Sequence, residues 1–332
     1  MTQAVPMVEL WRGDLLESMH RGHAVICNDA GEIIEAWGDP GRVIYPRSSC
    51  KMLQALPLVE SGAADAVGLP PELLALSCAS HQGAALHVGA VRNWLSGLNI
   101  AESDLRCGAH EPYDRDERDR LIRADERPCQ YHNNCSGKHA GMLTWTRHMK
   151  AGPEYVDPDH PLQRAIRTAF EEVTEESSPG YGIDGCSAPN FAVTVAGLAR
   201  AMQAFAAATG SGGVRDRAMH RLARAMATYP ELVAGEGRAC TELMRAMGHK
   251  VAIKTGAEAV FVAIIPEQKR GIALKIVDGN SRGSEGAITA LLVRLGVLDP
   301  AHPAALKRLG GPIRNWRGID TGQTRTVAGF PG

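Results

Sequence analysis

Segments with the pattern of β-strands lie only near the two ends of this chain of 332 residues, and this most limits how it can fold. Near the N-terminus, the apolar segments 23–27 and 33–37 flank the turn residues Asp29-Ala30-Gly31, which predicts a β-hairpin within 18–38. After residue 249, short runs rich in Val and Ile return at 251–253, 260–265 and 272–277. We therefore expect one sheet that draws strands from both ends of the chain.

Apolar residues recur at helical spacing through the middle of the chain. The helices predicted in this way cover 71–78, 84–97, 137–150, 160–175, 196–208 and 213–228, with another at 284–295 and one that begins at Ser48. The segments 98–135 and 176–190 are rich in Gly, Pro, Asn and Asp and are expected to be irregular. These patterns predict an α/β protein of one unit, 1–332, with an antiparallel sheet from about 1–45 and 249–332 and a mostly helical part, about 46–248, inserted between them.

Composition excludes several classes of function. The formal net charge is −1 and the arginines are scattered, so neither a nucleic acid nor an anionic membrane is an expected partner. The most apolar stretch, 257–265, is too short to span a bilayer, and the first residues lack a signal-peptide pattern. We therefore predict a cytoplasmic protein, in which a reducing environment disfavours disulfides among the eight cysteines.

The segment Arg47-Ser48-Ser49-Cys50-Lys51 contains a Ser-x-x-Lys pattern at the start of a predicted helix. Residues three apart lie on one helix face, so Lys51 could remove the proton of Ser48 and make its hydroxyl a nucleophile. The alternative is a capping serine followed by a solvated lysine, and the spacing alone does not exclude it.

Two further segments fit a serine hydrolase. Lys254-Thr255-Gly256 is expected to follow a short strand, and it matches the Lys-Thr-Gly element that accompanies Ser-x-x-Lys in penicillin-recognising enzymes. The Ser-x-Asn element of those enzymes does not occur in this sequence. Ser77-Cys78-Ala79-Ser80-His81 stands in its place, where Ser80 could pair with Lys254 or merely cap the end of a helix.

Residues 131–142 bring two histidines, two asparagines, a cysteine and a lysine together before a predicted helix. A second loop, 182–190, supplies Cys186 among turn residues. Two thiolates with one or two nitrogen ligands would suit Zn²⁺. Buried thiols with capping asparagines, or a structural zinc module without catalysis, explain the same residues.

Together these segments resemble the rhizobial-type L-asparaginase family, which differs from the asparaginases with a threonine nucleophile. The resemblance spans nearly the whole chain. It runs through the segments already quoted and through Cys107-Gly108-Ala109-His110, Gly182-Ile183-Asp184-Gly185-Cys186 and Ala273-Leu274-Lys275-Ile276-Val277-Asp278-Gly279.

The resemblance implies a fold akin to serine β-lactamases and glutaminases, a homodimer, and hydrolysis of L-asparagine to L-aspartate and ammonia. It also implies two Ser–Lys couples and one zinc site. These residues are the couples Ser48 with Lys51 and Ser80 with Lys254, and the zinc ligands Cys135, Lys138 and Cys186. Lysine binds a metal only when neutral, so the ion itself would have to lower the pKa of Lys138.

In the expected mechanism, Ser48 attacks the side-chain amide with Lys51 as the base, and water then hydrolyses the acyl-enzyme. Arg47 is the candidate partner of the substrate carboxylate, and Asp184 or Glu258 of its ammonium group. The remaining residues predicted at the substrate site, close to the metal ligands, are Asn133 and His139.

Two other readings of the sequence remain open. A penicillin-recognising serine hydrolase would share the Ser-x-x-Lys and Lys-Thr-Gly elements, although the missing Ser-x-Asn disfavours it. A zinc-stabilised binding protein without turnover would share the cysteines and lysine but would not need Ser48.

Overall fold

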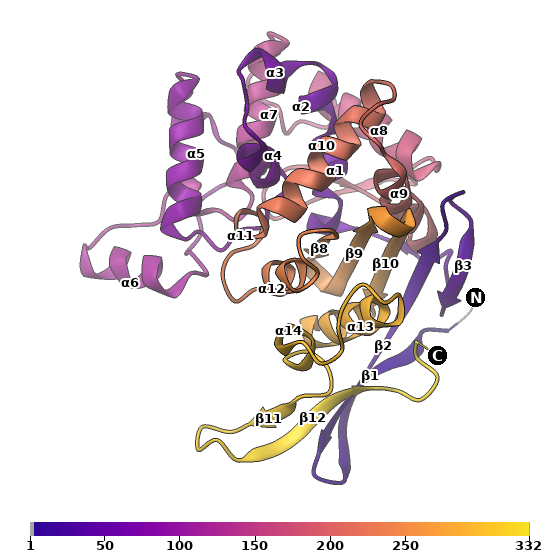
Figure 1. Ribbon diagram of the computed structural model, residues 1–332. Coiled ribbons are helices and arrows are strands. Elements are labelled where there is room, and N and C mark those ends of the chain that lie inside the picture. Colours follow the sequence, from indigo (N-terminus) through magenta and orange to yellow (C-terminus); the bar gives the residue numbers. More distant parts are fainter. Residues whose placement is uncertain (1–2, 332) are drawn as a thin grey trace. The chain divides into compact units, whose positions relative to one another are not determined.

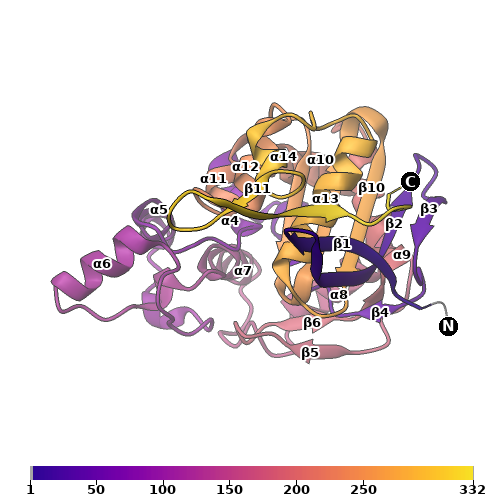
Figure 2. The ribbon, with the colours of Figure 1, turned by 90° about the horizontal axis from the view of Figure 1, so that it is seen from below.

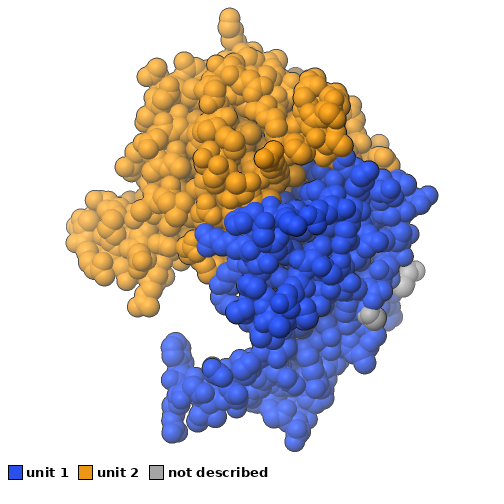
Figure 3. All heavy atoms as spheres, viewed as in Figure 1, with its two compact units in different colours: residues 1–49, 193–207, 242–332 blue, residues 50–192, 208–241 orange. Residues whose placement is uncertain are grey.

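The computed structural model describes residues 3–331 and divides into two compact units. Unit 1 contains the chain up to Ser49, Val193–Ala207 and the chain from Glu242 on; unit 2 contains Cys50–Ala192 and Ala208–Thr241 (Figure 3).

Unit 1 is built on an eight-stranded antiparallel sheet whose strands come from both ends of the chain. The strand order is β11-β12-β1-β2-β10-β9-β8, with β3 paired to β2. The strands are β1 Val5–Arg12, β2 Leu15–Cys27, β3 Ile33–Trp37, β8 Ala252–Gly256, β9 Val260–Ile265, β10 Arg270–Ile276, β11 Pro312–Arg314 and β12 Asp320–Thr326. A separate pair joins β4, Val43–Ile44, to β7, Val193–Thr194.

Helices cover both faces of this sheet, which is why β9 is apolar at every position (Figures 1 and 2). Helix α9, Val195–Ala207, packs where β10 has Gly271, and α13, Ser281–Arg294, packs on Ile276. These two strand positions are five residues apart, so they face opposite sides of the sheet. A Cβ at residue 271 would lie 2.1 Å from Gln203 N and 2.3 Å from Ala199 O, so only glycine allows α9 this approach.

Unit 2 is mostly helical. Its α-helices are α1 Lys51–Gln54, α2 Leu56–Glu60, α3 Ala63–Ala66, α4 Pro71–Ser77, α5 Ala85–Gly97, α6 Arg115–Arg123, α7 Ser136–His148, α8 Pro161–Thr174, α10 Val214–Thr228 and α11 Pro230–Val233. Helix α4 packs against both α7 and α10. The strands β5, Tyr181–Ile183, and β6, Pro189–Phe191, form a small hairpin. The chain passes from unit 2 to unit 1 within α12, Ala239–Ala246. Helix α14, Pro303–Leu306, belongs to unit 1.

The predicted α/β organisation, with an antiparallel sheet from both ends and a helical insertion, is confirmed. Strand β2 pairs with β3 across the predicted turn, and the long helices fall within a few residues of their predicted bounds. None of the helices in residues 3–331 is long and apolar enough to cross a membrane.

Four predictions about local structure were wrong. The helix expected from Ser48 begins as a 3₁₀ turn, Arg47–Cys50, and continues in the short pieces α1 and α2, because Pro57 interrupts the hydrogen-bond ladder. Lys254 lies inside β8 rather than after a strand. Segment 98–135 contains α6, which Asp114 caps by accepting from Glu117 N, and segment 176–190 contains β5 and β6.

We expect Gly271→Ala to lower the free energy of unfolding by about 1–3 kcal/mol, because the added Cβ meets backbone atoms of α9 that cannot rotate away. Denaturant unfolding followed by circular dichroism measures this. Gly89→Ala in α5 is the matched control, because its Cβ would meet nothing within 4 Å, and it should raise stability by up to about 1 kcal/mol. Equal effects of the two substitutions would contradict this packing argument.

Candidate active site

The segment that carries Ser48 is held in an uncommon backbone conformation within unit 1. Arg47 has φ of 52°, in the left-handed region that non-glycine residues seldom adopt. One residue after Ser48, the N–H and hydroxyl of Ser49 both donate to Pro46 O, at 3.2 and 2.7 Å. These bonds close a tight turn in which Ser48 is half-buried rather than placed at the start of a regular α-helix.

The Lys-Thr-Gly strand lies against this turn. A Cβ at Gly256 would be 2.6 Å from Pro46 O and 3.0 Å from Ser49 N, so the backbone of β8 touches the backbone of the turn. In the same strand Lys254 is fully buried and donates to Thr255 O at 2.7 Å. Within unit 1, the structure therefore places the turn that carries Ser48 against the Lys-Thr-Gly strand.

Lys51 is buried within unit 2, and the relative exposure of its side chain is 1%. Its ammonium donates to Ala79 O, to Ser80 Oγ at 3.0 Å and to Cys135 Sγ at 3.1 Å. A protonated amine has three hydrogens, so these three acceptors satisfy it completely. Loss of one proton would leave a basic lone pair beside the Ser80 hydroxyl.

Ser80 follows the end of α4 and is held by its backbone, because its N–H donates to Val233 O at 2.9 Å. Its hydroxyl bonds to Lys51, a contact that the sequence did not predict. Lys254 belongs to unit 1, so the predicted pairing of Ser80 with Lys254 stays a prediction.

The three predicted metal ligands converge within unit 2. Lys138 Nζ lies 3.0 Å from Cys186 Sγ, and the Cys135 thiol hydrogen-bonds to Cys186. That bond lowers the pKa of Cys186 far below its usual value; burial opposes the shift and the Lys138 charge adds to it. Burial lowers the pKa of Lys138, but the sulfurs of Cys186 and Cys135 outweigh burial and raise it overall. These pKa shifts favour a thiolate next to an ammonium in the cluster.

Cys186 reaches this cluster from a tight loop between β5 and β6. Asp184 N donates to Ala188 O at 3.0 Å, and Asp184 O accepts from Ser187 N at 2.8 Å. Ser187 adopts a left-handed φ of 71° at this turn. The half-buried Asp184 therefore closes the loop that carries the ligand, and its charge contributes to the raised pKa of Lys138.

His139 lies behind this cluster. Tyr155 OH accepts from Arg106 N at 2.8 Å and is hydrogen-bonded to His139 Nδ1, also at 2.8 Å. The other ring nitrogen, Nε2, is buried, and the ring also interacts with the side chain of Cys186. Burial lowers the pKa of His139, with Cys186 opposing, which favours the neutral ring.

Asn133 holds the loop that presents Cys135. Its amide donates to Cys107 O and Gly108 O, both at 2.9 Å, and its oxygen accepts from Cys135 N at 2.8 Å. These bonds to the backbone support a positioning role for Asn133 rather than a direct contact with substrate.

Arg47 and Glu258 both belong to unit 1. Glu258 is exposed, has φ of 58°, and its carbonyl accepts a hydrogen bond from Lys275. Arg47 contributes to the lowered pKa of Lys275, although burial is the larger cause.

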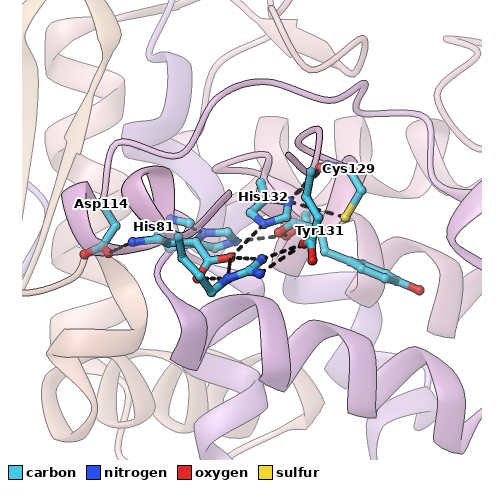
Figure 4. A network of polar contacts seen from close by, with 10 residues as sticks. His81, Asp114, Cys129, Tyr131 and His132 are labelled. Atoms are coloured by element: carbon cyan, nitrogen blue, oxygen red, sulfur yellow. Dashed lines mark hydrogen bonds and ion pairs between the residues drawn. The ribbon is translucent and has the colours of Figure 1, made fainter. Parts of the chain in front are cut away.

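A polar network that the sequence did not predict supports the same loop (Figure 4). His132 donates to Glu117 at 3.2 Å, and Arg120 donates to the same carboxylate at 2.9 Å. Nearby, His81 Nδ1 accepts from Gly83 N, so its Nε2 donates to Ser136 Oγ at 3.0 Å. The only available signal was the density of histidines at 132 and 139, because Glu117 and His81 are distant in sequence.

A scan against protein families matched the L-asparaginase II description over residues 8–326. The chain belongs to the L-asparaginase II family. Members of this family are amidohydrolases, so the predicted enzyme class and the resemblance found in the sequence are both confirmed. The match covers every motif described above. A search of curated protein sequences found no match.

Solved structures similar to this L-asparaginase II family member share little sequence with it. Mglu in its tris and glutamate form is 14% identical, has a TM-score of 0.50, and is matched over 90% of this chain and 63% of Mglu. Mglu in its glutamate form is 16% identical, has a TM-score of 0.50, and is matched over 84% and 61%. A β-lactamase from Mycobacterium bovis is 13% identical with a TM-score of 0.48, over 83% and 95%. The chain thus spans less than two thirds of Mglu, and at these identities the likeness concerns the fold alone.

We expect Glu117→Gln to destabilise the protein by about 2 kcal/mol at about pH 6, because the carboxylate bonds to Arg120 and to His132. Cys129 and then Glu117 hold the pKa of His132 above 6.5, against burial. The imidazolium therefore adds stability below about pH 6.5, which is lost as the pH rises through the raised pKa. The loss should be smaller at about pH 9.

Denaturant unfolding at both pH values measures this difference. Glu126→Gln is the matched control, because Glu126 also accepts from Arg120 but is exposed, and it should change stability by less than about 0.5 kcal/mol. A loss for Glu117→Gln that does not depend on pH would show that His132 is not charged in the folded protein.

Proposed function

We propose that this protein is an L-asparaginase that hydrolyses L-asparagine to L-aspartate and ammonia through an acyl-enzyme. The family match over residues 8–326 carries the proposal. The buried contact of Lys51 with Ser80 supports a mechanism in which a lysine moves the proton of a serine. A chromogenic β-lactam that reacts with the protein would favour a penicillin-recognising hydrolase instead.

Ser48 is the proposed nucleophile. It stands three residues before Lys51, and its turn packs against the Lys-Thr-Gly strand of unit 1. Lys51 in its neutral form takes the hydroxyl proton as Ser48 bonds to the amide carbon. The Ser80 hydroxyl, already bonded to Lys51, relays a proton to the departing ammonia, and Lys254 assists from β8.

The substrate's own charges need partners. In this proposal the guanidinium of Arg47, next to Ser48, binds the α-carboxylate through paired hydrogen bonds. Asp184 or Glu258 binds the α-ammonium group. Mglu has a glutamate form, and that amino acid carries the same α-carboxylate and α-ammonium groups.

Zinc is proposed as the resident metal. Within residues 3–331 no group of three His, Cys, Asp or Glu side chains can hold a metal, so Lys138 has to complete the donor set. Cys135, Lys138 and Cys186 do lie in contact, and two thiols and an amine suit Zn²⁺ once the ion displaces their protons. Bound there, zinc would supply positive charge and fix both loops.

The proposal also includes a cytoplasmic homodimer, which rests on the family resemblance alone.

Ser48→Ala should reduce ammonia release from L-asparagine by at least about 10³-fold, because the substitution removes the oxygen that acts as nucleophile in the proposed mechanism. Lys51→Met should cost about 10²–10⁴-fold through loss of the base. Ser61→Ala at the end of α2 is the matched control and should retain full activity. Activity that survives Ser48→Ala but disappears in Ser80→Ala would transfer the nucleophile role to Ser80, and an inactive zinc-loaded wild type would refute the asparaginase.

Removal of one metal ligand should remove the zinc. We expect Cys135→Ser and Lys138→Met to lower zinc content, measured by inductively coupled plasma mass spectrometry, from about one ion per chain to less than about one tenth. Cys78→Ser, another buried cysteine of unit 2, should keep the ion. Wild-type protein without zinc after purification in zinc-containing buffer would contradict the metal site. Zinc loss with unchanged ammonia release would assign the ion a structural role.

A further inference from the structure

A pocket of about 350 Å³ lies within unit 2 between α4 and α10. These two helices pack against each other (Figure 1). This volume is within the range of small-molecule sites. None of the residues discussed for catalysis or zinc binding lines it. Its floor is apolar, because Leu69, Leu74 and Ala225 are buried there.

One side of the pocket is cationic. Arg221 is paired with Asp65 at 2.7 Å, so its charge is compensated. Arg224, one turn further along α10, is exposed and has no ion pair within the part of the chain that the structure describes. The nearby carboxylate of Glu72 is itself engaged, by the hydroxyl of Tyr229. The pocket therefore offers an apolar floor and, in Arg224, one guanidinium without an ion pair among the described residues, which suits a small molecule with an apolar body and a single anionic group.

The two helices that line the pocket are both connected to Ser80. Helix α4 ends at Ser77, three residues before Ser80. Helix α10 continues through Tyr229 into α11, whose last residue, Val233, accepts the hydrogen bond from Ser80 N at 2.9 Å. A ligand that changes the spacing of the two helices would therefore move both the covalent and the hydrogen-bonded support of Ser80.

We propose that this pocket is an effector site for a small amphipathic anion, such as an aromatic carboxylate, whose binding changes turnover through the position of Ser80. The effect on turnover rests on the proposed catalytic role of Ser80, whereas binding does not. The bound carboxylate pairs with Arg224, and the ring lies on the floor formed by Leu74 and Ala225.

The probe is 1-naphthoate, with the neutral 1-naphthamide as its matched control, and isothermal titration calorimetry of the full chain measures binding. We expect saturable 1:1 binding of naphthoate and about tenfold weaker binding of the amide. Arg224→Glu should weaken naphthoate by at least about tenfold, and Ala225→Trp should abolish binding by filling the floor. Arg217→Glu makes the same charge change on α10 outside the pocket and should alter the affinity less than about twofold.

Ammonia release with and without saturating naphthoate completes the test. A severalfold change in kcat/KM that Arg224→Glu removes supports the proposal. No saturable binding, equal losses in Arg217→Glu and Arg224→Glu, or binding without any change in turnover would each overturn it. If the protein releases no ammonia, the proposed function fails, but calorimetry still measures whether naphthoate binds to the pocket. The two failures are therefore distinguishable.

Discussion

The buried ammonium of Lys51 is the interaction on which the candidate site of unit 2 depends. Burying a charge costs several kcal/mol unless every proton finds an acceptor. The acceptors of Lys51 come from residues 28, 29 and 84 positions further along the chain. The end of α4 and the loop before α7 therefore have to meet at one point, and the direct packing of α4 on α7 brings them there.

The thiol cluster extends this electrostatic arrangement. Cys135 is hydrogen-bonded to both Lys51 and Cys186. The sulfur of Cys135 therefore contacts the proposed base as well as a proposed metal ligand. The lowered pKa of Cys186 and the raised pKa of Lys138 both favour opposite charges that compensate each other inside the protein. Any metal that replaces these protons also changes the field at Lys51, which provides a physical route from zinc binding to the basicity of the lysine.

Local backbone strain occurs at three residues in or beside the candidate site, as well as at turns elsewhere in the chain. Arg47, Ser187 and Glu258 all have positive φ, and each lies beside a candidate functional residue or is one. Conformations of this kind persist only where surrounding contacts enforce them. At Arg47 the enforcing contacts are the two bonds from Ser49 to Pro46 and the close approach of Gly256.

The sequence by itself determined five strands of the sheet, the long helices and the candidate residue types, because strand and helix periodicity and the Ser-x-x-Lys, Lys-Thr-Gly and cysteine motifs are local patterns. It did not predict the strands β1, β11 and β12 of the same sheet. It missed α6, since that helix is largely polar and depends on its Asp114 cap. It also missed the break of the helix after Ser48. Only the tertiary structure decided that Ser80 bonds to Lys51, that Cys135 joins Lys51 to Cys186, and that Glu117 supports His132. The physical reason is that these contacts join segments that are distant in sequence. Each forms because a polar group that is buried by folding needs a hydrogen-bond partner.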